Sequence, residues 1–294
     1  MTSVRTLGPL INGTSLNHPV NAYLISITMQ QKQQPSGYVD SHYLDNANAF
    51  LRSVKQRSYE LMRICEGQTV LDLGCGVGID TLNLAGLVGS SGHVVGVDKD
   101  PGMIDEADQR AMQAGLGDRI SHRLGEARHL PYPDSHFDAC RTERMLMHLA
   151  DPVGVIAELK RVLKPGGWLV LTEPDWATLS IVSGQDDIER RLVRVHAEQV
   201  LANGYAGRQL YPWMRQAGFQ DLAVEITPFW DNDLERVRSV IPLDKVEAFS
   251  VAEGLLSPEG LETWHSFLRL ANEQAGFFFS VSINMVAGRK AAGL

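Results

Sequence analysis

The stretch Val70-Leu71-Asp72-Leu73-Gly74-Cys75-Gly76-Val77-Gly78 decides the fold of this chain. An apolar run that contains an acid, Asp72, opens into a loop with three glycines, and we expect a helix from about Ile79. Glycine has no Cβ, so backbone N–H groups in the loop can approach a ligand, and the helix N-terminus adds a partial positive charge. The spacing G-x-G-x-G is one residue tighter than the dinucleotide-binding fingerprint. The stretch therefore predicts a strand, loop and helix that hold a nucleotide-type ligand.

A second acid lies where the ribose of such a ligand needs one. Asp98 closes the apolar run at 93–97. A carboxylate at the end of the second strand, about 20 residues past the loop, is placed to take both ribose hydroxyls. The glycine loop alone also fits an ordinary tight turn between a strand and a helix, whereas the loop and the acid together predict a nucleoside.

Further elements of the same kind follow along the chain. The sequence predicts strands at 119–124, 137–141 and 168–173, a helix from about Pro152 to Leu163, and a turn at Lys164-Pro165-Gly166-Gly167. With these motifs in this order, residues 69–173 resemble the class I S-adenosylmethionine-dependent methyltransferases, in the branch that tailors small molecules such as natural products. The resemblance implies an α/β fold with a doubly wound, Rossmann-like sheet of seven strands, mostly parallel with the last strand antiparallel, and a helical cap.

The resemblance also implies which residues hold the cofactor, S-adenosyl-L-methionine. Asp72 and the loop backbone are expected at its methionine end, Asp98 at the ribose and Glu126 at the adenine amino group. Glu126 is one methylene longer than the aspartate common in the family, and Met103 fits either the adenine face or the core of its own helix. Cys75 is expected to be the small residue that the loop tolerates and not a nucleophile. The complete expected set is Asp72, Gly74, Cys75, Gly76, Gly78, Asp98, Lys99, Met103, Glu126, Ala127 and Arg141.

Composition fits a soluble enzyme. The chain has 294 residues, of which 44% are hydrophobic, and a net charge of −8 without a dense basic stripe, which argues against a nucleic-acid partner. No apolar run approaches the length needed to span a membrane, about 18 residues. Cys65, Cys75 and Cys140 are dispersed, which predicts a reducing, cytoplasmic setting. No cluster of cysteines or acids suggests a metal.

Domain boundaries follow from changes in composition. Residues 1–35 carry two charged side chains, Arg5 and Lys32, lack the pattern of a signal peptide and are expected to be a disordered extension, with Met29 as an alternative start. Residues 36–66 are expected to form cap helices at the cofactor mouth, 67–230 the Rossmann-like core, 231–275 a helical insertion over the substrate, and 276–294 the last strand and tail.

Candidate catalytic groups lie at the carboxyl ends of the fourth and fifth strands, where an open α/β sheet binds its ligand. His148 has an ordinary pKa suited to proton removal, but a lone histidine is often structural. Glu173, with Asp175 beside it, is a base candidate because an apolar pocket raises a carboxyl pKa, and its alternative role is a hydrogen-bond anchor for the turn. Aromatic residues expected to contact the substrate, or to serve packing alone, are Tyr38, Tyr43, Trp176, Tyr205 and Trp230.

The large, apolar region after residue 173 predicts the substrate class. We expect a bulky hydrophobic small molecule and N- or C-methylation of a secondary metabolite, with an indole or terpenoid alkaloid as a faint resemblance. Four alternatives stay open: O-methylation of a quinone or polyketide, an NAD-dependent oxidoreductase, a catalytically idle S-adenosylmethionine binder, and use of part of the cap surface to form a homo-oligomer. An oxidoreductase would want the third glycine one residue later and gives no reason for Lys-Pro-Gly-Gly.

Overall fold

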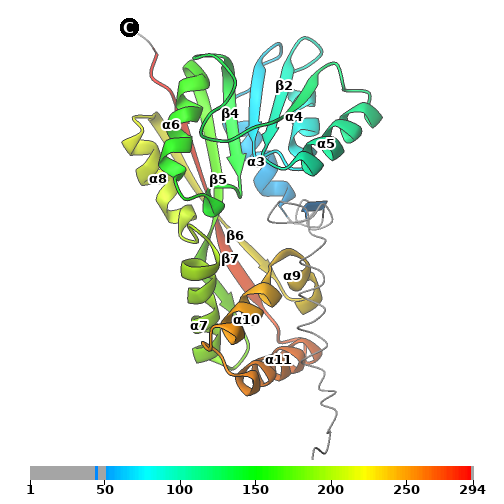
Figure 1. The fold of residues 1–294 in the computed structure, drawn as a ribbon, viewed down its shortest axis with the longest axis vertical. Coiled ribbons are helices and arrows are strands. Elements are labelled where there is room, and N and C mark those ends of the chain that lie inside the picture. Colours follow the sequence, from blue (N-terminus) through cyan, green and yellow to red (C-terminus); the bar gives the residue numbers. More distant parts are fainter. Residues whose placement is uncertain (1–43, 46–50, 293–294) are drawn as a thin grey trace, which may run out of the picture. The chain divides into compact units, whose positions relative to one another are not determined.

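The computed structural model describes residues 44–45 and 51–292, and a seven-stranded sheet organises them (Figure 1). The strand order is β3-β2-β1-β4-β5-β7-β6, and β7 runs antiparallel to both of its neighbours. The predicted fold class is thereby confirmed. The strands are β1 (Thr69–Leu73), β2 (His93–Asp98), β3 (Ile120–Leu124), β4 (Phe137–Glu143), β5 (Leu163–Ile181), β6 (Gln220–Asp231) and β7 (Phe279–Arg289).

Helices cover both faces of the sheet because alternate residues of its central strands are apolar on each side. Val70 and Val170 pack with α3 (Arg52–Leu61) and α4 (Ile79–Leu87), and α5 (Pro101–Gln113) follows β2. Leu71 and Leu171 pack on the opposite face with α6 (Pro152–Val162) and α8 (Ala206–Gln216). The helix predicted from about Ile79 begins at that residue.

Strand β5 is much longer than the predicted strand at 168–173. At its start, Lys164-Pro165-Gly166-Gly167 forms an irregularity within the strand, where the register against β4 shifts between Phe137 and Ala139. At its end, β5 continues past Pro174 to Ile181 while pairing with β7. Proline lacks the N–H that a central strand needs, but β4 ends at Glu143, opposite Thr172, so β5 has become an edge strand at this point.

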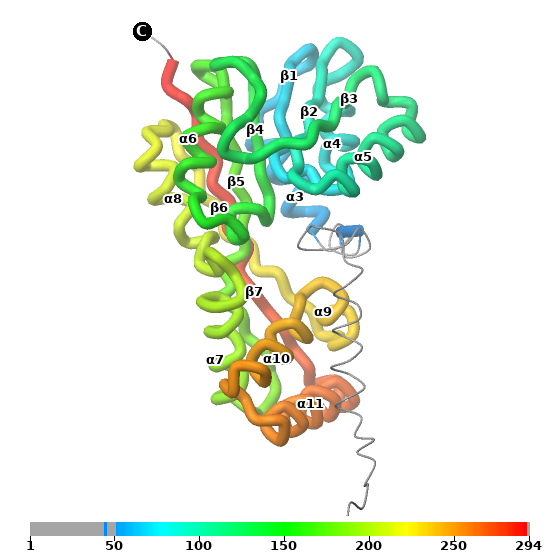
Figure 2. The backbone as a smooth tube through the Cα atoms, viewed as in Figure 1, coloured from blue at the N-terminus to red at the C-terminus, as the bar shows by residue number. Residues whose placement is uncertain are grey.

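The extended ends of β5, β6 and β7 carry a second group of helices, here called the cap (Figures 1 and 2). It contains α7 (Asp186–Val195), the π-helical segment η2 (His196–Val200), α9 (Leu234–Val240), α10 (Leu243–Ala252) and α11 (Pro258–Glu273). The single helix predicted from Asp186 to Asn203 therefore changes to π geometry after Val195 and ends at Val200.

A buried acid joins the last three helices of the cap. Oε1 of Glu247 accepts hydrogen bonds from Nε1 of Trp264 at 2.9 Å and from Nη2 of Arg238 at 3.0 Å, and Oε2 lies 2.9 Å from Nε2 of His265. Trp264 is fully buried. Because α9, α10 and α11 each contribute to this group, they are held together as one layer. None of the helices in the described ranges is long and apolar enough to cross a membrane.

Candidate functional site

The glycine loop lies between β1 and α4 and has the geometry that a close ligand requires. Gly74 and Gly76 have φ of +76° and +52°, a region that side-chain-bearing residues rarely adopt. The N–H groups of Gly74 and Cys75 donate to the carbonyl of Val97, which fixes the loop to β2. A Cβ on Gly76 would lie 3.0 Å from Cδ1 of Leu44, and one on Gly74 would lie 3.0 Å from Sδ of Met145. Two apolar side chains therefore lie against the loop.

Asp98 is brought to the same loop, as the sequence predicts. Its Oδ2 accepts a hydrogen bond from the N–H of Gly76 at 2.9 Å, and its Oδ1 accepts one from the N–H of Asp100 at 3.0 Å. The residue is half-buried, so its carboxylate is oriented by the backbone and retains lone pairs for hydroxyl donors. This is the arrangement that a ribose needs.

The residues expected to contact the adenine of the cofactor lie around Asp98. Met103 is buried in the first turn of α5, which Asp100 caps by accepting from the N–H of Gly102 at 2.8 Å. Lys99 and Glu126 are exposed and Ala127 is half-buried. The N–H of Gly125 donates to the carbonyl of Asp98 at 2.9 Å, so the segment after β3 lies beside the end of β2.

Asp72 and Arg141 form a buried ion pair beneath the loop. Nη1 of Arg141 lies 2.9 Å from Oδ1 of Asp72 and 3.1 Å from Oδ2 of Asp80, and Nη2 lies 2.6 Å from Oε2 of Glu143. Oδ2 of Asp72 has no hydrogen-bond partner, and burial raises the pKa of this carboxyl to about 7. Because its terminal nitrogens serve three carboxylates, Arg141 holds Asp72 in place and has only Nε without a partner.

Helix α3 completes this network, which the sequence reasoning missed. Nζ of Lys55 lies 2.5 Å from Oδ2 of Asp80 and 3.1 Å from Oε1 of Glu143, and the hydroxyl of Tyr59 donates to Oδ1 of Asp80. Lys55 and Tyr59 are four residues apart on one helix face. That spacing was the available signal, but nothing local in the sequence shows that the face is buried against acids.

Glu173 lies where β5 passes the loop after β4. Its Oε1 accepts hydrogen bonds from the N–H groups of Met145 at 2.8 Å and Leu146 at 2.6 Å, while Oε2 has no partner. The residue is fully buried, and this burial raises its pKa to about 8. At neutral pH the carboxyl is therefore mostly protonated, which favours the anchoring role over the role of a base.

His148 and Asp175 are the other two predicted catalytic residues. Burial lowers the pKa of His148 to about 4, helped by the positive charges of Lys99, Arg144 and Lys245, so its imidazole is neutral at pH 7. Since Lys245 belongs to α10, His148 lies near both the core and the cap. Oδ2 of Asp175 accepts a hydrogen bond from Nε of Arg208 at 2.6 Å, and its Oδ1 has no partner.

The predicted aromatic contacts separate into different environments. Trp176 is buried, and its Nε1 donates to Sδ of Met147 at 3.2 Å. The hydroxyl of Tyr205 donates to Glu198 at 2.7 Å. Trp230 is 58% exposed on β6 and stacks on Phe278, so the structure does not bring it to an enclosed site. Two further predicted contacts, Tyr38 and Tyr43, lie outside the described residues.

Buried polar atoms without partners gather at this end of the sheet. Within the described ranges, the residues that carry such atoms on these strands or on the segments that cover them include Asp72, Thr142, Thr172, Glu173, Asp175, His196 and Asn284. Tyr132 also carries one, but it lies elsewhere in the structure. Such atoms are rare in folded proteins and mark places where a ligand or water completes the hydrogen bonding. The free oxygen of Asp72, the glycine cradle and the oriented Asp98 together fit a ligand with an ammonium and a ribose. Within the same ranges, no group of three or more histidines, cysteines and acids could hold a metal ion.

Comparisons with known proteins agree with this geometry. The family model described as "Methyltransferase domain" matches residues 64–218. An uncharacterised 37.1 kDa protein in transposon TN4556 of Streptomyces fradiae is 33% identical over 239 residues, covering 81% of this chain and 67% of the relative. Methyltransferase GfsG of Streptomyces halstedii is 30% identical over 206 residues, covering 70% and 69%. The chain thus spans about two thirds of the length of these curated relatives.

A solved structure shows the same fold at low sequence identity. Geranyl diphosphate C-methyltransferase from Streptomyces coelicolor A3(2) superposes with a TM-score of 0.53 at 17% identity, over 82% of this chain and 79% of that chain. Its structure contains S-adenosyl-L-homocysteine and geranyl diphosphate.

Proposed function

The chain belongs to the methyltransferase domain family, and from that membership we propose that it methylates a bulky, mostly hydrophobic small molecule, with S-adenosyl-L-methionine as the methyl donor. The observation that carries the proposal is the position of Asp98, whose carboxylate is held by the N–H of Gly76 beside the unpartnered Oδ2 of Asp72. The carboxylate of Asp98 suits the two ribose hydroxyls, and the carboxylate of Asp72 suits the ammonium of the methionine moiety.

The protein's contribution to methyl transfer is positioning. When bound, the cofactor supplies a methyl group on a positively charged sulfur, which keeps the bonding electron pair as the methyl carbon moves to the nucleophile. Asp72 and Asp98 hold the donor at two points, which restricts the approach of the acceptor to one line. The extended β5, β6 and β7 carry the cap beyond the end of β4 (Figure 1), and water that the cap excludes there cannot hydrolyse the donor.

His148 is our candidate for proton removal. The imidazole is neutral at pH 7, so one ring nitrogen is free of a proton. Glu173 is mostly protonated at the same pH, and it serves the reaction by fixing Met145 and Leu146 beside the glycine loop. A neutral amine acceptor needs no base during transfer, whereas a hydroxyl acceptor does.

The cap supports a hydrophobic acceptor. Leu179 of β5 and the helix residues Leu192, Leu243, Val246 and Trp264 face a common interior. A neighbour of the same fold, geranyl diphosphate C-methyltransferase, supports this proposal, because its structure contains geranyl diphosphate. We propose N- or C-methylation of a secondary metabolite, for which indole and terpenoid alkaloids are the first acceptors to test. O-methylation of a quinone or polyketide remains the second candidate, favoured by the neutral imidazole of His148.

We place the enzyme in the cytoplasm, without a nucleic-acid partner. Cys65, Cys75 and Cys140 are all free, and burial raises the pKa of Cys75 well above its usual value, which fits a structural and unreactive thiol. The acidic net charge of −8 opposes binding to a polyanion. A homo-oligomer remains compatible with the exposed apolar side chains Trp230, Phe267 and Leu270.

One experiment tests the activity directly. The purified chain is incubated with S-adenosylmethionine labelled in the methyl group and with panels of indoles, terpenoid alkaloids, quinones and polyketides, and methyl incorporation is scored. We expect incorporation into a hydrophobic acceptor and none with an Asp98→Asn variant at limiting cofactor. Tight cofactor binding by calorimetry without incorporation into any panel would instead support a catalytically idle binder.

A further inference from the structure

His196 has a buried imidazole that makes no hydrogen bond with any described group. The residue is 3% exposed, and neither Nδ1 nor Nε2 has a hydrogen-bond partner. Burying a polar group without a hydrogen-bond partner costs free energy. Nothing in the sequence around position 196 distinguished this histidine, because its helix shows an ordinary apolar pattern.

The backbone around His196 is built to keep it in this position. His196 begins the π-helical segment η2, and single π turns occur frequently at functional sites. The segment is closed by the N–H of Leu201, which donates to the carbonyl of His196, and by the N–H of Gly204, which donates to Ala197. The N–H of Asn203 then donates to the carbonyl of Met147 at 2.9 Å. The π turn is thereby fixed to the loop that Glu173 anchors beside the glycine loop.

The surroundings of the imidazole are aromatic and apolar. Its ring lies edge-on to the indole of Trp176, with centroids 4.6 Å apart and an interplanar angle of 83°. His148 is the titratable neighbour that bears on its charge, and both rings are neutral at pH 7 because burial lowers their pKa values to about 4. A neutral imidazole carries one donor nitrogen and one acceptor nitrogen.

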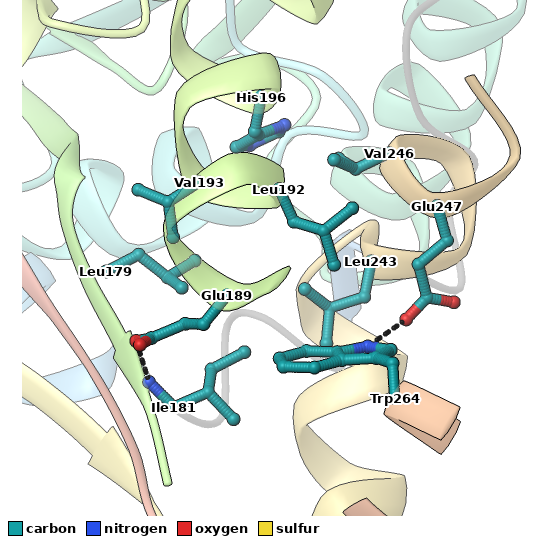
Figure 3. Close-up of a pocket in the computed structure, with 10 residues that line it drawn as sticks. All are labelled: Leu179, Ile181, Glu189, Leu192, Val193, His196, Leu243, Val246, Glu247 and Trp264. Atoms are coloured by element: carbon teal, nitrogen blue, oxygen red, sulfur yellow. Dashed lines mark hydrogen bonds between the residues drawn. The ribbon is translucent and has the colours of Figure 1, made fainter. Parts of the chain in front are cut away.

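A small cavity begins at this ring. Its volume is about 20 Å³, and it lies between α7 on one side and α10 and α11 on the other. Figure 3 shows His196 at one end, on the same helix as Leu192 and opposite Val246, with Trp264 at the other end. The two acids that line the cavity already accept hydrogen bonds, Glu189 from the N–H of Ile181 and Glu247 from Nε1 of Trp264. The cavity is roomy enough for about one water, but its apolar walls suit a nonpolar occupant.

Building on the proposed function, we propose that His196 recognises a hydrogen-bond donor, a hydroxyl or an N–H, on the apolar body of the methyl acceptor. The unpartnered ring nitrogen accepts this bond, Trp176 packs against the apolar body, and the cavity of about 20 Å³ has to enlarge to admit that body. His196 is a specificity residue in this scheme, because the donor that it binds need not be the atom that is methylated. An acceptor without such a donor leaves the buried imidazole unsatisfied and binds more weakly.

Two probes of the same shape test the proposal without knowledge of the natural acceptor. 2-Naphthol carries one hydroxyl, and 2-methylnaphthalene carries a methyl group in its place. The dissociation constants of both are measured by fluorescence with the enzyme saturated with S-adenosyl-L-homocysteine. The ratio of the two constants is compared between wild type and His196→Phe, so that differences in hydration between the probes cancel. We expect the preference for the naphthol to fall about five- to tenfold in the variant, the value of one hydrogen bond between neutral groups.

Two further variants separate recognition from folding. His196→Gln keeps an amide acceptor and is expected to retain part of the preference. His136→Phe makes the same substitution between Tyr132 and Phe137, away from the cap, and is expected to leave the ratio unchanged. The melting temperature and the affinity for S-adenosyl-L-homocysteine establish that each variant is folded.

The outcomes distinguish this proposal from the one that it rests on. Equal ratios in wild type and both His196 variants, or no binding of either probe to the wild-type complex, overturn the role of His196 alone. Failure of the wild-type chain to bind S-adenosyl-L-homocysteine overturns the proposed function itself.

Discussion

Nζ of Lys55 lies 2.5 Å from Oδ2 of Asp80, and this buried ion pair ties α3 to the first turn of α4 directly after the glycine loop. The same ammonium lies 3.1 Å from Glu143 at the end of β4. A helix that precedes the core in the chain thus fixes the acids around Asp72, and the proposed cofactor site depends on it.

Removing the charge of Lys55 should destabilise the fold strongly. Lys55→Met removes the positive charge that offsets the buried carboxylates of Asp80 and Glu143. We therefore expect a loss of about 3–5 kcal/mol in the free energy of unfolding, measured with urea. Arg57→Met is the matched control on the same helix, because Arg57 pairs with Glu225 in an exposed position and should cost about 0–1 kcal/mol. Similar losses in both variants would show that the buried network is not special.

Removing the charge of Asp98 should weaken cofactor binding. Asp98→Asn keeps an oxygen for the N–H of Gly76 but loses a charged acceptor for the ribose, so we expect S-adenosyl-L-homocysteine to bind about 10- to 150-fold more weakly, equivalent to roughly 1.5–3 kcal/mol. Calorimetry provides the measurement. Asp105→Asn, which removes an exposed charge on α5, should leave the affinity unchanged. An unaltered affinity in a folded Asp98 variant would exclude the ribose contact.

Cofactor affinity should depend on pH through Asp72. Its pKa is raised to about 7, so the carboxylate that we propose for the ammonium of the cofactor is lost as pH falls through 7. We expect the affinity for S-adenosyl-L-homocysteine to weaken by up to about tenfold per pH unit between pH 7 and pH 5.5. 5′-Methylthioadenosine lacks the ammonium and serves as the control ligand, and Asp72→Asn should flatten the profile. If both ligands followed the same profile, the ammonium would not be the group that Asp72 binds.

Glu173 should make stability fall as pH rises. Its pKa is raised to about 8 in the folded state, so between the ordinary carboxyl range and pH 8 the folded protein holds a proton that the unfolded chain has lost. Stability contributed by this proton decreases by up to about 1.4 kcal/mol per pH unit over that interval. Urea unfolding of wild type and Glu173→Gln at several pH values measures the difference, and parallel curves would mean that the carboxyl is ionised.

His148 should matter for some acceptors and not for others. His148→Gln removes the neutral imidazole, and we expect kcat for a hydroxyl acceptor to fall by about 10²- to 10⁴-fold with unchanged cofactor affinity. A neutral amine acceptor should retain most of its rate. The methyl-labelling assay measures both, and full activity of the variant on a hydroxyl acceptor would leave His148 a structural role only.

The amino-acid sequence by itself determined the central strands, the glycine loop and the place of Asp98. These features depend on neighbouring residues: an apolar run, glycines that permit positive φ, and an acid at a strand end. The sequence could also assign the order of the elements, because each strand and helix has its own local pattern.

Tertiary structure alone decided how the charged and polar groups combine. Lys55, Asp80 and Arg141 meet although 86 positions separate the first and last in the chain (141 minus 55), and the burial that raises or lowers the pKa of a carboxyl or imidazole is a property of all the elements packed around it. Strand β5 can likewise continue through Pro174 because β4 ends opposite Thr172 and leaves that edge of β5 unpaired. The anchoring of Glu173 and the unsatisfied ring of His196 likewise arise from contacts between distant segments, which local patterns of residues do not encode.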